Sequence, residues 1–164
     1  MTSLQRGRAD LAWHYTTGDC LKGIAQDQRI KLENGPILNK RERRCVWFST
    51  SATYEPTALK VQVCPDGSTY PFQSAQEQAP HCGGLVRIGV PTSRLHSYDT
   101  WRQRSGVTPF DAAGLHYVAV QEGANPERDW FVSFKTVKTD AWQVIEVSLD
   151  GIHWHSPTQL KTAA

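Results

Sequence analysis

Segments of strand composition recur along this chain of 164 residues, and helices do not separate them in a regular order. A doubly wound parallel sheet needs a helix between successive strands, and that repeating order is missing here. The sequence therefore predicts an α+β fold in which the C-terminal third forms antiparallel sheet. The strand-type runs lie at 12–17, 45–51, 84–91, 130–137, 143–149 and 152–155.

The first strand-type run, "AWHYTT", is followed at once by a helix start. Side chains alternate between the two faces of a strand, so Trp13 and Tyr15 lie on one face while His14 and Thr16 lie on the other. The face with His14 and Thr16 is therefore the polar one. The short helix that follows is capped by Thr17 or Asp19, carries Leu21 and Ile24 on one side, and ends between Asp27 and Arg29.

A longer helix is expected over residues 108–123. Thr108 followed by Pro109, with Asp111 three residues after the threonine, is a typical helix start, and Gly123 provides the stop. In the strand at 84–91, Val86, Ile88 and Val90 form a face that reads as core. Near the C-terminus, Asp150-Gly151 predicts a two-residue hairpin that joins 143–149 to 152–155.

Two stretches read as surface loops. Residues 33–44 contain a Gly-Pro turn and then the basic cluster Lys40, Arg41, Arg43 and Arg44, which is expected to be solvated. Residues 65–80 are rich in turn formers and glutamine and show neither helical nor strand periodicity. We interpret this second stretch as an insert in a single domain spanning residues 1–164.

Composition excludes several classes of protein. No apolar run approaches the roughly 18 residues that span a bilayer, and the first residues lack the apolar stretch of a secretory signal, so we expect a cytoplasmic protein with no membrane partner. The four cysteines form no CxxC pair and are expected to be free thiols. The spacing of Cys64, His81 and Cys82 matches no familiar zinc pattern, so no metal site is predicted. A net charge of +2 does not by itself indicate a nucleic-acid binder.

Neither a GxGxxG nor a GxxxxGK[ST] motif is present, so a nucleotide would need another kind of site. Three runs pair aromatic with polar residues at strand ends, as a pocket for a flat ligand requires. Taken singly, each is better explained by core packing. The three runs are "WHYTT", "VWFSTSATYEPT" and "GANPERDWFVSF".

The order of these runs resembles the ADP-ribosyltransferase superfamily, in its diphtheria-toxin and poly(ADP-ribose) polymerase-like branch, and the chain is also similar to a bacterial group with WHYT and VWFST runs. The resemblance implies split antiparallel sheets with a few short helices, and NAD as substrate. It implies that His14 binds a ribose hydroxyl, with Thr16 on the same ligand face. The backbone of Tyr15 would pair with the nicotinamide carboxamide.

The second run carries further roles that the resemblance implies. Tyr54, or Trp47 and Phe48, would cover the nicotinamide ring, and Ser49 would support the catalytic carboxylate. Arg87 is a candidate contact for an anion, because arginine offers planar bidentate pairing, although a salt bridge to Glu146 or to another carboxylate of the sheet would explain it equally well.

The catalytic acid is expected at the start of the late strand. Asp129 is the first candidate and Glu127 the second, whereas the family usually carries glutamate directly before this strand. Glu122 and Glu55 are the alternative carboxylates. The alternative interpretation is that Asp129 and Glu127 have no catalytic role and are simply solvent-exposed residues of the turn after Asn125-Pro126.

Three functions remain open at this point. The first is an NAD-dependent ADP-ribosyltransferase, in the manner of a toxin or defence factor, with a nucleic acid or a protein as acceptor. The second uses the same pocket with water as acceptor, which makes an NAD glycohydrolase. The third is a domain without catalysis that binds a nucleotide or nucleic acid.

Overall fold

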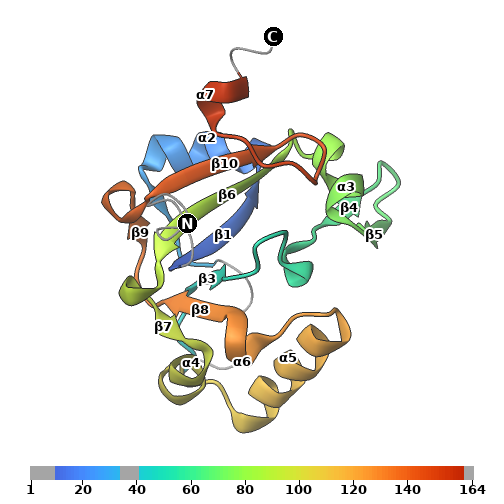
Figure 1. Cartoon of the computed structure of the whole chain (residues 1–164). Coiled ribbons are helices and arrows are strands. Elements are labelled where there is room, and N and C mark those ends of the chain that lie inside the picture. The colour runs from blue at the N-terminus through green and yellow to red at the C-terminus, as the bar shows by residue number, and fades with distance from the viewer. Residues whose placement is uncertain (1–9, 34–40, 161–164) are drawn as a thin grey trace.

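A six-stranded sheet forms the centre of the protein in the computed structural model, which describes residues 10–33 and 41–160 (Figure 1). The strand order is β10-β6-β1-β3-β8-β7, and every neighbouring pair is antiparallel. The predicted α+β class with antiparallel sheets is therefore confirmed. The strands are β1 (Leu11–Thr17), β3 (Val46–Ser49), β6 (Leu85–Pro91), β7 (His96–Ser97), β8 (Trp130–Ser133) and β10 (Val144–Ser148).

The pairing between β1 and β3 divides this sheet into two halves. Strand β1 pairs with β6 along its whole length, from Leu11 opposite Pro91 to Thr17 opposite Leu85. With β3 it shares a single pair, Trp13 opposite Ser49. The halves β10-β6-β1 and β3-β8-β7 therefore meet at one point and separate beyond it.

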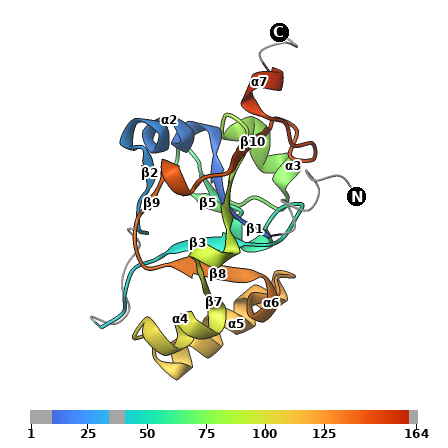
Figure 2. The ribbon, with the colours of Figure 1, turned by 60° about the vertical axis from the view of Figure 1, so that its left-hand side comes forward.

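Helices lie against both halves (Figure 2). Helix α2 (Gly18–Asp27) lies beside the β10-β6-β1 half, while α4 (Tyr98–Arg104), α5 (Pro109–Gln121) and α6 (Pro126–Asp129) lie beyond the other half. The remaining helices are α3 (Ala75–Gln78), α7 (Pro157–Leu160) and the 3-10 turns η1 (Pro56–Ala58), η2 (Ala79–His81), η3 (Thr92–Arg94) and η4 (Thr139–Ala141). Two small ladders pair β2 (Arg29–Ile30) with β9 (Val137–Lys138) and β4 (Val61–Val63) with β5 (Thr69–Pro71).

Helix α2 begins and ends where the sequence predicts. Leu21 and Ile24 pack against the buried core that includes Val86 and Ile88. Thr17 occupies the N-cap position, but its side chain makes no capping hydrogen bond. The helix ends before Gln28, whose φ of 51° is left-handed. Because α2 starts directly after β1, it covers the end of that strand.

Helix α5 is confirmed together with its predicted ends. The Thr108 hydroxyl accepts a hydrogen bond from the Asp111 N–H, and Gly123 adopts a φ of +89° after the last turn. Only Ala112 and Ala119 of this helix are buried among the described residues. Phe110 is 87% exposed, so the helix rests on the protein by a narrow face of small side chains.

Residues 65–80 are more ordered than an irregular insert, and this part of the prediction is wrong. They contain β5 and α3, and Phe72, Ala75 and Gln78 are buried. The side chain of Ser74 caps α3 by accepting a hydrogen bond from the Glu77 N–H. The sequence shows no helical periodicity here because α3 is only one turn long.

The predicted core face of β6 is confirmed, since Val86, Ile88 and Val90 are buried in the core, and the face with Leu85 and Arg87 is buried as well. One further expectation is corrected. The two-residue hairpin at Asp150-Gly151 is not formed. Instead the Asp150 carboxylate accepts hydrogen bonds from the N–H groups of Ile152 and His153, and the chain returns to β10 only as an isolated bridge between Val147 and His155.

Candidate functional site

A cavity of about 730 Å³ lies where β1 and β3 separate. Small-molecule and cofactor sites typically occupy about 300–1,000 Å³. The volume therefore suits a cofactor-sized ligand. Of the residues predicted to bind one, those that line this cavity are His14, Tyr15, Trp47, Phe48 and Ser49.

His14 lines the cavity, and its hydrogen bond defines its tautomer. Its Nδ1 lies 3.0 Å from the carbonyl oxygen of Trp47 on the neighbouring strand. A carbonyl oxygen can only accept, so Nδ1 carries the proton and Nε2 is an acceptor. Burial lowers the pKa of His14 to about 4; the bond to Trp47 opposes this shift, and the charge of Lys60 adds to it. The imidazole is therefore neutral at physiological pH.

Glu55 is the buried carboxylate of the same cavity. It lies at the N-cap of η1, directly before Pro56, with an extended backbone. The hydroxyl of Ser49 donates to its Oε2 at 2.5 Å, and the hydroxyl of Thr57 donates to its Oε1 at 3.0 Å. Both oxygens are thus oriented by hydroxyl groups that come from β3 and from η1.

Trp47 forms the aromatic wall of the cavity. Its ring packs edge to face on Trp101, at a centroid distance of 5.0 Å, and on Trp130, at 5.3 Å. Those two tryptophans are buried, whereas Trp47 is partly exposed. Because Trp101 and Trp130 already fix the side-chain conformation of Trp47, a ligand can stack on its exposed surface with little further loss of side-chain entropy.

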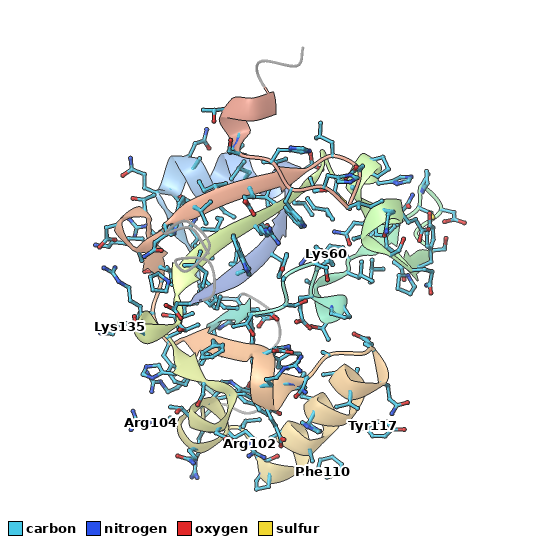
Figure 3. All side chains as sticks on the ribbon, in the orientation of Figure 1. Lys60, Arg102, Arg104, Phe110, Tyr117 and Lys135 are labelled. Atoms are coloured by element: carbon cyan, nitrogen blue, oxygen red, sulfur yellow. The ribbon has the colours of Figure 1, made fainter. Side chains whose placement is uncertain are left out.

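The charged groups around the cavity are of both signs. The lining residues include four carboxylates and four cations, so their formal charges sum to zero. Lys60, which is labelled in Figure 3, follows η1 in the chain. Its positive charge contributes to the lowered pKa of His14. The backbone N–H of Lys60 donates to Oε1 of the buried Gln78 at 2.7 Å. The charged lining residues are Lys31, Glu33, Glu42, Arg43, Arg44, Glu55, Lys60 and Asp111.

Asp129 and Glu127, the two carboxylates predicted as the catalytic acid, do not line the cavity that holds His14. Asp129 lines a second cavity of about 440 Å³, which shares Glu55 with the first cavity. Its carboxylate accepts hydrogen bonds from Arg128 and from the Thr50 hydroxyl, and these contacts lower its pKa. Glu127 is exposed, with His116 at 3.9 Å. Both residues precede the late strand, but α6 turns them away from the split in the sheet.

Arg87 is occupied by contacts within the protein. Its Nε donates to Glu146 at 2.7 Å and its Nη1 to the carbonyl oxygen of Ala52, while Trp13 and Trp154 lie on its guanidinium at 4.2 and 4.4 Å. Of the two explanations left open for this residue, the salt bridge is the one observed. Arg87 lines neither cavity and is better described as an anchor for the chain at Ala52.

The remaining predicted ligand contacts are Thr16, Tyr15 and Tyr54. Thr16 is buried and lines neither cavity, because α2 covers that part of the strand. The Tyr15 hydroxyl donates to the Ser51 carbonyl oxygen, and burial raises the pKa of Tyr15 to about 12. Tyr54 lines the smaller cavity, and its hydroxyl donates to the Ala58 carbonyl oxygen at 3.2 Å.

Thr57, Lys60 and the tryptophan pair behind Trp47 were not anticipated from the sequence. The signal for Glu55 and Thr57 was present in "YEPT", since a polar residue before proline marks a turn that follows a strand. The sequence offered no equivalent signal for Trp101, which reaches Trp47 from α4.

No protein-family model, curated protein or solved structure matches the chain. Across residues 10–33 and 41–160, none of the helices is both long and apolar enough to cross a membrane. In that same part of the chain, no three histidine, cysteine, aspartate or glutamate side chains are grouped so that they could hold a metal ion.

Proposed function

We propose that the protein is an ADP-ribosyltransferase that cleaves nicotinamide from NAD and transfers ADP-ribose to a nucleic acid or protein acceptor. The observation that supports this function is the presence of His14 and Glu55 in one cofactor-sized cavity at the split between β1 and β3. The division of the sheet into two antiparallel halves agrees with the fold that the sequence resemblance implies.

NAD would be bound by groups that come from both halves of the sheet. The neutral His14 accepts a hydrogen bond at Nε2 from a ribose hydroxyl, for which its tautomer is suited. Strand β1 is unpaired with β3 beyond Trp13, so the backbone near Tyr15 can pair with the nicotinamide carboxamide. Trp47 stacks on a ring of the cofactor, and Lys60 attracts its phosphates.

Glu55 would serve as the catalytic carboxylate. The bond between nicotinamide nitrogen and ribose C1′ breaks, and nicotinamide leaves with the bonding electron pair. Positive charge develops on the ribose, and a carboxylate beside it stabilises the transition state more than the ground state. A nucleophilic group of the acceptor forms the new bond to C1′ and gives up its proton, for which Glu55 is a suitable base.

The test is incubation of the full-length protein with NAD labelled in its adenylate part, together with RNA, DNA or protein acceptors. Transfer predicts released nicotinamide and a labelled macromolecule. Released nicotinamide with free ADP-ribose alone would show an NAD glycohydrolase, and unchanged NAD would show a domain that only binds. In the first two cases Glu55→Gln should lower nicotinamide release by about a hundredfold to a thousandfold.

The matched control is Asp140→Asn, which neutralises an exposed carboxylate on η4 and should leave turnover unchanged. Asp129→Asn separates the two positions for the acid. A loss of turnover in Asp129→Asn together with full activity in Glu55→Gln would overturn the assignment of Glu55.

A further inference from the structure

Positive charge is concentrated in three segments that lie far apart in the sequence. Residues 41–44, 94–105 and 133–138 hold eight of the 18 lysine and arginine residues but only two of the 16 aspartate and glutamate residues. The rest of the chain is therefore net acidic, although the total is +2. A charge distribution of this kind creates a local positive potential that the net charge conceals.

Backbone and ring contacts bring these segments together. The Arg43 N–H donates to the Ser105 carbonyl oxygen at 2.6 Å, which places the first segment beside the end of α4. The guanidinium of Arg43 lies over the ring of Phe134 at 4.3 Å, and the ring of His96 lies 5.5 Å from the same phenyl ring. The three segments thus form one surface, which we name the basic face.

The cations of the basic face are accessible. Arg43, Arg94, Arg102, Arg104 and Lys135 are all exposed. Figure 3 shows Lys135, Arg104 and Arg102 following one another around the edge of the molecule, from the chain after β8 to α4. Asp99 pairs with Arg102 and offsets one of these charges. The remaining excess of cations favours a partner with several negative charges.

We propose that the basic face binds single-stranded nucleic acid. Six of its eight cations are arginine, whose planar fork pairs with phosphate oxygens in a bidentate manner and stacks on aromatic rings. Arg43 lies over the Phe134 ring, and the His96 ring is tilted at 40° to that ring, so flat groups lie beside the cations. Single strands are bound by this combination of phosphate contacts and flat groups on which bases stack. An acidic protein segment would use the charges but not the stacking groups.

The position of the basic face relates it to the cavity. Arg43 belongs to the basic face and also lines the cavity of about 730 Å³. A strand held on this face therefore passes the mouth of the cavity. The binding of nucleic acid does not rest on the proposed reaction with NAD, and it is measured without NAD.

Binding is tested with the full-length protein and a fluorescent single-stranded oligonucleotide of about 12 nucleotides, followed by anisotropy. We expect affinity to fall steeply between about 50 and 200 mM salt, with a slope that grows by about 0.7 for each phosphate contacted. Arg104→Glu and Lys135→Glu should each weaken binding about fivefold to tenfold and reduce the slope. Lys22→Glu, which makes the same charge change on α2, should leave the affinity unaltered.

Three results would overturn the proposal. The first is an absence of salt-dependent binding by the unaltered protein. The second is an equal loss of affinity in Lys22→Glu and Lys135→Glu, which would show a general charge effect without a defined face. The third is binding of a duplex or of a poly-glutamate peptide as tight as that of the single strand, which would assign the face to a different partner.

Discussion

The hydroxyl of Ser49 donates a hydrogen bond to Oε2 of Glu55 at 2.5 Å, and this contact joins the end of β3 to the start of η1. Ser49 is the residue of β3 that pairs with Trp13 of β1. The point at which the two halves of the sheet meet is therefore also the point that orients the carboxylate of the cavity.

The first prediction concerns this hydrogen bond. Ser49→Ala removes one of the two hydroxyl donors to Glu55 while the other, Thr57, remains. Hydrogen bonds to charged groups contribute about 1.5–3 kcal/mol, so we expect nicotinamide release to slow about tenfold to hundredfold, in kcat more than in KM. Ser51→Ala is the matched control, because that hydroxyl donates to the Tyr54 carbonyl oxygen instead. Equal rates for the two variants would exclude the orienting role of Ser49.

The second prediction follows from the pKa of His14, which burial lowers from 6.5 to about 4. Between these values the unfolded chain binds a proton that the folded protein does not bind, so stability declines as the pH falls from about 6.5 to 4. The contribution reaches up to about 3 kcal/mol. Urea unfolding across this range should show a shallower decline for His14→Gln. The exposed His81, changed to Gln, should retain the full decline, and identical curves for all three proteins would contradict the assignment.

The third prediction concerns the buried pair of Arg87 and Glu146. Arg87→Met removes the positive charge beside a carboxylate that is 2% exposed, and loss of one partner of a buried pair typically costs about 3–5 kcal/mol. Arg87→Met combined with Glu146→Leu removes both charges and should be less destabilised than the single variant. Chemical denaturation measures both. A single variant that loses under about 1 kcal/mol would show that this pair does not hold the sheet and the chain at Ala52 together.

The fourth prediction compares two glycines with positive φ. A Cβ at Gly106 would approach the carbonyl oxygen of Arg41 to 2.4 Å, whereas a Cβ at Gly123 would meet nothing within 4 Å. Both Ala variants incur the left-handed backbone cost of about 1 kcal/mol. Gly106→Ala adds a clash of about 1–3 kcal/mol, so its melting temperature should be several degrees below that of Gly123→Ala. Equal melting temperatures would contradict the close approach of residues 41 and 106.

The sequence by itself determined those features that depend on neighbouring residues. Helix α5 was predicted with its cap at Thr108 and its stop at Gly123, because capping and left-handed turns are local chemistry. Strand β6 and helix α2 were also predicted, from the spacing of apolar residues along the chain. The hairpin predicted from Asp150-Gly151 does not form. The Asp150 carboxylate accepts hydrogen bonds from the backbone N–H groups of Ile152 and His153 instead.

Only the tertiary structure decided which carboxylate joins His14. Asp129 directly precedes Trp130 and Glu55 directly follows Tyr54, each near the end of a strand, and their sequence contexts rank Asp129 first. In the folded chain the Asp129 carboxylate accepts a hydrogen bond from Arg128. The Glu55 carboxylate lines the cavity and accepts a hydrogen bond from the Ser49 hydroxyl. The same holds for Arg87, which was a plausible anion contact until Glu146 came opposite it in the sheet. Which side chains come together at these positions depends on the pairing of strands that are distant in the sequence. The neighbours of a side chain across a sheet cannot be predicted from the residues next to it in the chain.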